Sequence, residues 1–248
     1  MRPTMASASP PDPPRITCCL FAWNEVASFR AVADEQLAAL ERLGVSYELL
    51  VVDDGSSDGT GAAADTLAAE RPQVRVIHHA GNQGLGAVYR TCFGQARGTF
   101  VTFFPADGQF PAGNLAALYP LAESWDFVLG TLPGRHDSAL GALLSRAERL
   151  LFRVAVGRLP RLEGIFMVRR QVLEDITLRS QGRAWTVVWE LLLRAQRQGR
   201  RMTNVPVELQ PRKHGSSKVN NLRTMMVNLR GLLALKRLLR DDTQGARP

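Results

Sequence analysis

Short apolar runs alternate with longer stretches of helical periodicity along the first half of the chain. The apolar runs predict five strands, at 16–21, 47–52, 74–78, 99–104 and 126–130. Helical patterns fill the gaps between them, through residue 43, over 59–70, over 84–96 and from 111 onward. Alternation of this kind is typical of βαβ units. The pattern therefore predicts an α/β fold whose mostly parallel central sheet is flanked by helices.

Three residues are expected to mark helix boundaries in this half. Asn24 follows the first strand and is predicted to cap the first helix, which Gly44 would end. Pro111 suits the first turn of the helix after the fourth strand.

The second half is patterned less regularly and is rich in arginine. Helical periodicity runs over 138–156, 184–197 and 219–239, and strands are expected at 164–168 and 202–209. A polar loop covers 211–217. Since no repeat or linker interrupts the pattern, residues 15–240 are predicted to form one domain.

Both termini are expected to lie outside the folded domain. Residues 1–14 are rich in Pro and Ser without an apolar core segment, which predicts a disordered leader rather than a signal peptide, and 241–248 are expected to be a flexible tail. No apolar run reaches eighteen residues, so a spanning helix is not expected. Cys18 and Cys19 lie in an apolar run, which predicts reduced, buried thiols and a cytoplasmic protein.

The charge is distributed unevenly between the halves. Residues 1–134 carry 8 Lys and Arg against 14 Asp and Glu, whereas residues 135–240 carry 22 against 7. A basic half can meet nucleic acid, an anionic membrane surface or a phosphorylated ligand. Nucleic acid ranks last among these partners and is not expected, because the aromatic residues of this half occupy core-like positions rather than a stacking surface: Phe152, Phe166, Trp185 and Trp189.

Polar residues follow three of the predicted strands. They are Asn24 and Glu25, Asp53 and Asp54, and Asp107 with Gln109. In open α/β sheets, ligands bind beyond the carboxyl ends of the strands, where these groups are expected to meet. A plainer interpretation stays open, because residues 54–58 also suit an Asx turn and a helix cap.

The chemistry of these groups suggests a nucleotide and a metal. Asp107 and Gln109 offer hard oxygen ligands for Mg²⁺ or Mn²⁺, which commonly bind substrate phosphates as well. Asp53 would hydrogen-bond a base or ribose. A simple Asp-Gly turn is the alternative for Asp107, and no dinucleotide or P-loop motif follows any strand.

A basic loop late in the chain supplies the complementary charge. Arg212, Ser216 and Lys218 are suited to phosphate oxygens, although a solvated surface loop would have the same composition.

Several motifs together resemble the family-2 glycosyltransferases. They are Asn24-Glu25, VVDDGSSDGT at 51–60, GNQGLGAVYR at 81–90, PADGQF at 105–110 and VPVELQPRKHGSSKV at 205–219. The likeness covers roughly residues 16–239 and is greatest to the branch of dolichol-phosphate mannose synthases and polyprenyl-phosphate glycosyltransferases.

This resemblance implies a GT-A fold, a GDP- or UDP-sugar donor, a divalent metal, a polyprenyl or dolichyl phosphate acceptor and inversion at the anomeric carbon. Residues 15–134 would then form the nucleotide-sugar half and 135–240 the acceptor half. The implied donor-binding residues are Asn24, Glu25, Asp53, Asp54, Gly84 and Asp107. Asp107, Arg212 and Lys218 would be catalytic, Asp107 and Gln109 would hold the metal, and Arg135, Arg212, Ser216 and Lys218 would bind phosphates.

The chain also departs from the family pattern. Pro105 replaces the first Asp of the usual Asp-Ala-Asp motif, and Trp23 replaces a tyrosine. No transmembrane tail like that of many relatives is expected.

Two alternatives to lipid glycosylation remain open. The same donor could serve a soluble hydroxyl acceptor, for which Glu190 is the nearest base, or the chain could be a catalytically weak binding subunit that has lost the metal. The helix over 219–239 would either rest on a membrane surface, at the inner face, or pack against the sheet domain.

Overall fold

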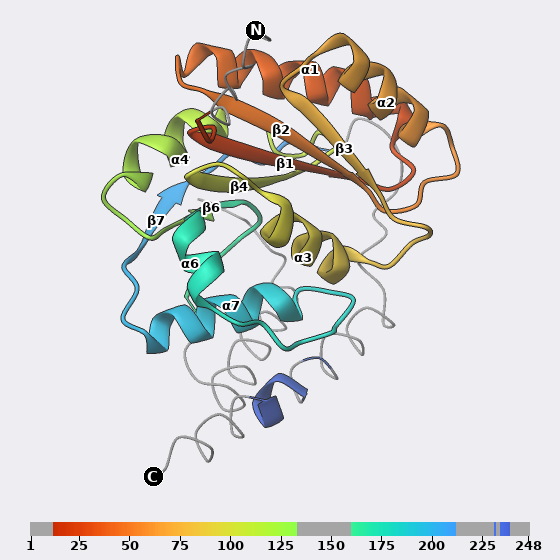
Figure 1. Cartoon of the computed structure of the whole chain (residues 1–248). Helices are drawn as coiled ribbons and strands as arrows, with labels where there is room; N and C mark the ends of the chain where they lie inside the picture. Colours follow the sequence, from red (N-terminus) through yellow and green to blue (C-terminus); the bar gives the residue numbers. More distant parts are fainter. Residues whose placement is uncertain (1–11, 133–159, 212–230, 232–233, 239–248) are drawn as a thin grey trace, which may run out of the picture.

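The computed structural model describes residues 12–132, 160–211, 231 and 234–238, and its centre is a seven-stranded sheet (Figure 1). The strand order is β3-β2-β1-β4-β6-β5-β7. The strands are β1 (Ile16–Ala22), β2 (Tyr47–Asp53), β3 (Val74–His78), β4 (Phe100–Pro105), β5 (Phe127–Thr131), β6 (Phe166–Arg169) and β7 (Met202–Pro206). This confirms the predicted α/β class.

The arrangement of the first four strands creates a natural ligand crevice. β1 pairs in parallel with both β2 and β4, and β2 pairs in parallel with β3. From β1 the chain proceeds outward to β2 and β3, and then returns to the other side of β1 as β4. Such a reversal separates the loops after β1 and β4, which makes the carboxyl ends of these strands the expected binding position.

β6 gives the sheet its only antiparallel strand among those that the structure describes. It lies between β4 and β5 and runs antiparallel to both, whereas β5 and β7 are parallel. The sheet is therefore mostly parallel, as predicted.

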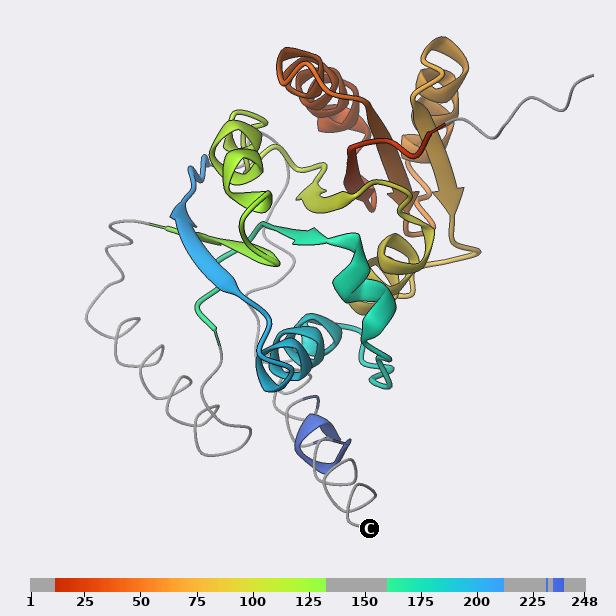
Figure 2. The same cartoon turned by 60° about the vertical axis from the view of Figure 1, so that its left-hand side comes forward.

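Helices cover both faces of the sheet (Figures 1 and 2). One face carries α1 (Val26–Arg42), α2 (Thr60–Glu70) and α4 (Asn114–Ala122), and the other carries α3 (Leu85–Gln95), α6 (Arg170–Asp175) and α7 (Thr186–Arg197). Side chains of β2 alternate between the two cores: Leu49 and Val51 pack into one, Leu50 and Val52 into the other. The continuous apolar run of β2 is thus explained by burial on both faces.

The prediction that Asn24 caps the first helix is wrong. Asn24 lies before the helix with φ +54°, and α1 begins at Val26. The amide of Val26 instead donates to Asp58 Oδ2 at 3.0 Å, so the cap comes from a residue 32 positions away. Gly44 does follow the end of α1, with φ +67°, as expected.

Other boundaries shift by a few residues. α4 begins at Asn114, three residues after Pro111, and β7 ends at Pro206 rather than at 209. The short helix α6 had no counterpart in the sequence pattern. The helix expected over 138–156, the basic loop from 212 onward and most of the helix over 219–239 lie outside the described residues.

All three cysteines are free and buried, as predicted. Within the described ranges, none of the helices combines the length and the apolarity needed to cross a bilayer.

Candidate functional site

The loops after β1 and β4 meet at the reversal point of the sheet. Ser28, in the first turn of α1, donates from its hydroxyl to the carbonyl of Ala106 at 2.8 Å and lies 3.5 Å from Glu25 Oε2. Because the single hydroxyl proton goes to Ala106, the 3.5 Å approach to Glu25 is a proximity rather than a second hydrogen bond, and it places the Glu25 carboxylate near the backbone just before Asp107. The loop that carries Glu25 therefore lies beside the turn that carries Asp107.

Asp107 lies on a tight turn that suits a ligand group. Its side chain accepts a hydrogen bond from the amide of Gln109 at 3.0 Å, and Gly108 between them has φ +72°. Asp107 is 6% exposed. The turn and the hydrogen bond hold this buried carboxylate in a fixed position at the carboxyl end of β4.

The donor set fits a divalent ion only in part. Pro105 ends β4 where the family pattern has an acid, and among the described residues no group of three His, Cys, Asp or Glu side chains could hold a metal. Asp107 and Gln109 offer one carboxylate and one amide. Mg²⁺ and Mn²⁺ tolerate so few protein ligands where substrate phosphates and waters complete the shell.

The segment that leads to the basic loop lies against this turn. The amide of Gln210 donates to the carbonyl of Gln109 at 2.8 Å. Asn114 and Glu208 form a two-way pair, in which the Asn114 side chain accepts from the Glu208 amide at 2.8 Å and donates to its carbonyl at 3.0 Å. Arg212 follows two residues after Gln210. Arg135, Arg212, Ser216 and Lys218 themselves lie outside the described residues.

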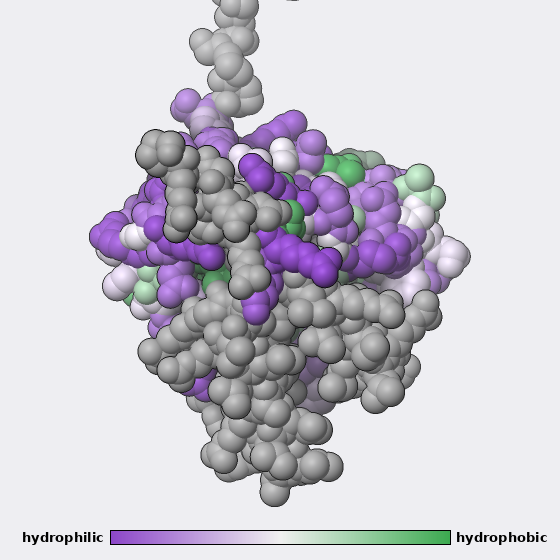
Figure 3. All heavy atoms as spheres, turned by 90° about the horizontal axis from the view of Figure 1, so that it is seen from below, coloured by the Kyte–Doolittle hydropathy of each residue, from purple (hydrophilic) through white to green (hydrophobic). Residues whose placement is uncertain are grey.

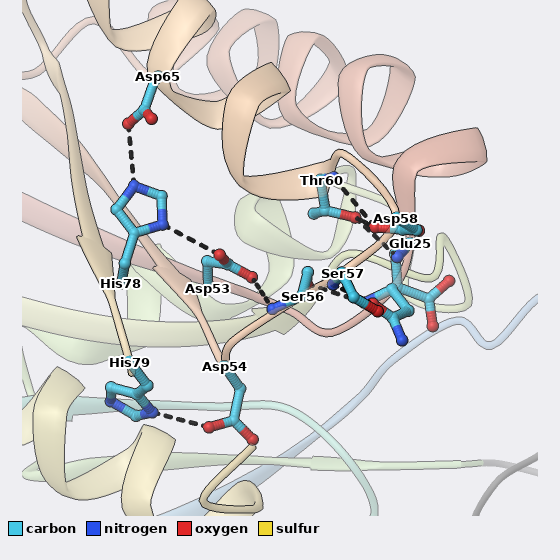
Figure 4. Close-up of polar contacts among 11 residues, drawn as sticks. Glu25, Asp53, Asp54, Ser56, Ser57, Asp58, Thr60, Asp65, His78 and His79 are labelled. Carbon is cyan, nitrogen blue, oxygen red and sulfur yellow. Dashed lines mark hydrogen bonds and ion pairs between the residues drawn. The ribbon is translucent and has the colours of Figure 1, made fainter. Parts of the chain in front are cut away.

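Hydrogen bonds join the loop after β1 to the loop after β2 (Figure 4). Three successive backbone amides, at residues 24–26, donate to side-chain oxygens of the second loop. One amide of the second loop donates to a side chain of the first. The bonds are Asn24 N to Ser56 Oγ at 2.9 Å, Glu25 N to Thr60 Oγ1 at 3.0 Å, Val26 N to Asp58 Oδ2 at 3.0 Å, and Ser57 N to Asn24 Oδ1 at 2.8 Å. The polar residues of the DDGSSDGT motif therefore lock the two loops together.

Asp53 and Asp54 face opposite layers of the fold, and each is 4% exposed. Asp53 accepts from the amide of Ser56 at 3.1 Å and contacts His78. Asp54 accepts from the amides of Gln83 and Gly84, at 2.9 and 2.8 Å, at the start of α3. Gly84 thus lies beside the loop after β2, and its amide donates to Asp54.

Two adjacent histidines, His78 and His79, contact the aspartates of this site, although no pattern in the sequence assigns them to it. His78 Nδ1 lies 3.0 Å from Asp53 Oδ2, and His79 Nδ1 lies 2.7 Å from Asp54 Oδ1. Parallel pairing of β2 with β3 sets Asp53 beside His78, in a register that the alternation of strands and helices does not specify. The hydrogen bonds to Asp53 and to Asp65 raise the pKa of His78, against the opposing effect of burial.

Arg183 is a further residue beside the predicted site that no pattern in the sequence indicates. Its guanidinium donates to the carbonyl and the side-chain oxygen of Asn82, at 2.8 and 2.9 Å, and its carbonyl accepts from the Gly86 amide at 2.9 Å. A Cβ at Gly86 would lie 1.9 Å from the carbonyl oxygen of Gly182. The GNQGLG motif is therefore glycine-rich partly because another loop packs directly against it.

Glu190 does not serve as a base for an acceptor hydroxyl. It is completely buried in α7 and accepts hydrogen bonds from the amides of Arg179 and Ser180 and from Arg194 Nε. Glu190 is a paired structural acid, which was the other interpretation of its position.

Large exposed hydrophobic side chains gather on the segments that form the site. Within the described ranges they are Trp23 (38% exposed), Val26 (45%) and Leu209 (44%). Trp23 and Val26 flank Asn24 and Glu25, and Leu209 precedes Gln210. Elsewhere the surface is more polar: the face seen in Figure 3 is predominantly hydrophilic over its described residues, with hydrophobic side chains only in small patches.

Comparisons with known proteins agree with this fold and with these motifs. The model of glycosyl transferase family 2 matches residues 19–177. An undecaprenyl-phosphate mannosyltransferase from Micrococcus luteus is 32% identical over 219 residues, which cover 83% of this chain and 88% of the relative. A polyprenol monophosphomannose synthase from Mycolicibacterium smegmatis is 34% identical over 193 residues, covering 72% of this chain and 73% of the relative.

Solved structures confirm the GT-A fold. A mannosyl-3-phosphoglycerate synthase from Rubrobacter xylanophilus superposes with a TM-score of 0.69 at 19% identity, covering 94% of this chain and 76% of its own. A glucosyl-3-phosphoglycerate synthase from Mycobacterium tuberculosis, crystallised with Mn²⁺ and UDP-glucose, gives 0.64 at 18% identity, with 90% and 80% covered. The family model spans well over half of the chain, and both relatives are more than 30% identical. The chain belongs to glycosyl transferase family 2 and is a glycosyltransferase.

Proposed function

We propose that this glycosyltransferase moves a sugar from a GDP- or UDP-sugar to a polyprenyl or dolichyl phosphate, with inversion at the anomeric carbon. The observation that carries the proposal is the meeting of Glu25, the Asp107 turn and the segment leading to Arg212 at the reversal point of the sheet. Both relatives reported above are named for transfer to a polyprenyl carrier, which supports the lipid acceptor.

The donor would bind across the loops after β1, β2 and β4. Asn24, Glu25 and Asp53 would contact the nucleoside, with Asp54 and Gly84 supporting the loop that closes this side. Asp107 and Gln109 would hold a Mg²⁺ or Mn²⁺ ion. When bound, such an ion supplies positive charge that stabilises the departing diphosphate.

The acceptor phosphate would attack without a strong general base, because a phosphate monoester already carries negative charge near pH 7. One phosphate oxygen forms the new bond to the anomeric carbon while the bond to the nucleoside diphosphate breaks. Arg135, Arg212, Ser216 and Lys218 would bind the acceptor phosphate and the leaving diphosphate. The complete burial of Glu190 favours this chemistry over attack by a hydroxyl, which needs a base within reach.

The exposed side chains at the rim of the site would meet the lipid. Trp23 and Val26 offer apolar surface on the segment after β1, and Leu209 offers it on the segment that leads to Arg212. An isoprenoid tail, or the membrane that holds it, is a natural partner for such a rim. The enzyme would thus act in the cytoplasm as a peripheral protein at the inner face of the membrane.

The experiment is a transfer assay with radiolabelled GDP- and UDP-sugars, a short polyprenyl phosphate and Mg²⁺ or Mn²⁺. Label that partitions into organic solvent supports the proposal, whereas label in a water-soluble product would indicate a soluble acceptor. Binding of nucleotide without transfer to either phase would indicate a catalytically weak subunit, for which Pro105 is the motivation.

A pair of variants tests the role of the Asp107 turn. Asp107→Asn is expected to lower transfer at least about a hundredfold, the usual scale for a group that stabilises developing charge. Asp34→Asn removes an exposed carboxylate from α1 and should leave transfer unchanged. Equal activity of the two variants would refute the assignment of Asp107.

A further inference from the structure

Two adjacent histidines at the end of β3 pair with two adjacent aspartates at the end of β2. Parallel pairing sets Asp53 beside His78, and alternate side chains of a strand point to opposite faces. His78 and Asp53 therefore face the layer of α2, where His78 Nε2 lies 2.9 Å from Asp65 Oδ1 (Figure 4). The next pair, His79 and Asp54, turns toward α3.

The geometry around His78 requires both ring nitrogens to be protonated. Nδ1 lies 3.0 Å from Asp53 Oδ2 and Nε2 lies 2.9 Å from Asp65 Oδ1. An ionised carboxylate only accepts hydrogen bonds, whereas a neutral imidazole has one N–H and one lone pair. Loss of a proton would leave a lone pair facing a carboxylate oxygen, so one of the two contacts would become repulsive.

His79 makes contacts of a different kind, although it is the neighbouring residue. Its Nδ1 lies 2.7 Å from Asp54 Oδ1, and its Nε2 lies 2.8 Å from the Thr91 hydroxyl. A hydroxyl can donate as well as accept, so a neutral imidazole satisfies both partners. The contacts of His79 therefore need only one N–H on the ring, whereas the contacts of His78 need two.

Space beside the Asp53–His78 pair is kept free by a glycine. A Cβ added at Gly61 would lie 2.8 Å from Asp53 Oδ2 and 3.3 Å from His78 Cε1. The first turn of α2 thus leaves room for the pair.

We propose that His78 is a proton-dependent positioning residue of the donor site, whose imidazolium holds Asp53 in place for the nucleotide. This inference rests on the proposed function. A chain of contacts carries it: Asp53 holds the amide of Ser56, and the Ser56 hydroxyl holds the amide of Asn24. Loss of the proton on His78 releases one end of this chain and loosens the loops that would bind the nucleoside.

The charged surroundings of His78 set the direction of the pH effect. Among the described residues, Asp53 from β2 and Asp65 from α2 are the charged groups that contact the ring. Arg75 lies on the same strand as His78, and His79 directly follows that strand. Asp53 and then Asp65 raise the pKa of His78. Nucleotide binding is therefore strongest below that raised pKa and weakens as the pH increases through it.

The test measures binding of GDP and of UDP, each with Mg²⁺, by calorimetry between pH 6 and pH 9. The affinity of the wild-type protein for the nucleotide that binds is expected to fall roughly three- to tenfold across the alkaline range, the scale of a charged hydrogen bond in a partly exposed pair. His78→Gln should bind at the weaker level at every pH. Asp65→Asn, at a side chain that is 64% exposed, should move the fall to lower pH, and NMR should show the His78 ring titrating at lower pH.

Glu70→Gln is the matched control, because it removes another exposed carboxylate of α2 that pairs with Arg30 and does not contact His78. It should follow the wild-type profile. Three outcomes would refute the role of His78 and leave the proposed function intact. They are a wild-type affinity that does not change with pH, a profile of Asp65→Asn that is not shifted, and wild-type binding by His78→Gln. If neither nucleotide binds the wild-type protein at any pH, the proposed function fails, and the role of His78 fails with it.

Discussion

Replacing Glu190 by glutamine tests whether this buried acid is structural. Glu190 is completely buried, and both of its oxygens are engaged. Oε1 accepts from Arg194 Nε at 2.8 Å and from the Arg179 amide at 3.0 Å, while Oε2 accepts from the Ser180 amide at 2.7 Å. Glutamine offers one acceptor oxygen and one NH₂ group. Whichever way it turns, its NH₂ meets a donor, either Arg194 or the Ser180 amide.

The cost follows from these contacts. Removing one partner of a buried ion pair destabilises a protein by about 3–5 kcal/mol, and glutamine keeps part of the hydrogen bonding, so we expect a loss of about 3 kcal/mol in the free energy of unfolding. For a protein of this length, 1 kcal/mol corresponds to about 2–4 °C in Tm. Glu190→Gln should therefore melt about 6–12 °C below the wild-type protein.

Urea unfolding followed by circular dichroism and thermal melting measures the effect. Glu174→Gln is the control, since Glu174 also pairs with an arginine four residues away, Arg170, but its side chain is 46% exposed. That change should cost less than about 1 kcal/mol. Transfer per folded molecule should be unchanged in Glu190→Gln at low temperature. A variant that melts like the wild-type protein but has lost transfer would refute the structural role and restore Glu190 as a candidate base.

Three further outcomes are expected. Gly86→Ala should destabilise the protein by roughly 1–3 kcal/mol because its Cβ would lie 1.9 Å from the Gly182 carbonyl oxygen, whereas Gly94→Ala, in the same helix with open space around it, should be neutral or stabilising in the same melts. Asp54→Ala should cost roughly 2–4 kcal/mol and speed hydrogen exchange at the start of α3, because two amides lose their acceptor. The pKa of His78 is higher in the folded protein than in the unfolded one, so protonation of His78 stabilises the fold. This stabilisation is complete below the pKa of the unfolded state and is lost as the pH rises through the pKa of the folded state. The urea midpoint of the wild-type protein should therefore fall toward that of His78→Gln over that range.

The parallel part of the fold could be predicted because its strands are buried on both faces. Runs such as Leu49 to Val52 are uniformly apolar, which is typical of a strand covered by helices on each side. The expected positions of β1 to β5 agree with the structure to within a residue or two. The meeting of Glu25 with the Asp107 turn follows from the same topology, since it requires only that β1 and β4 be neighbours.

The remaining features depend on contacts between distant segments. The apolar run of β6 predicts a strand. Its position between β4 and β5 and its antiparallel direction depend on pairing with these two strands, which are distant in the sequence. Asn24 is of a residue type that often caps helices, yet the amide of Val26 at the start of α1 is capped by Asp58, which lies 32 residues further along the chain. The sequence predicts His78 only as the last residue of a strand, because its partner Asp53 depends on the register with β2.

The polar residues after β2 cannot be divided cleanly into structural and ligand-binding ones. Asp54 and Asp58 hold the starts of α3 and α1, and Asp53 holds the turn at Ser56, so replacing any of them would disturb the loops as well as the contact with a ligand. Loss of activity in such variants would not identify a ligand contact. Asp53 differs from the others because an exposed carboxylate, Asp65, contacts its partner His78 and raises the pKa of that histidine. Changing Asp65 alters the charge that holds Asp53 and leaves every atom of the DDGSSDGT motif in place, and it is the variant that separates positioning of the site from stability of the loop.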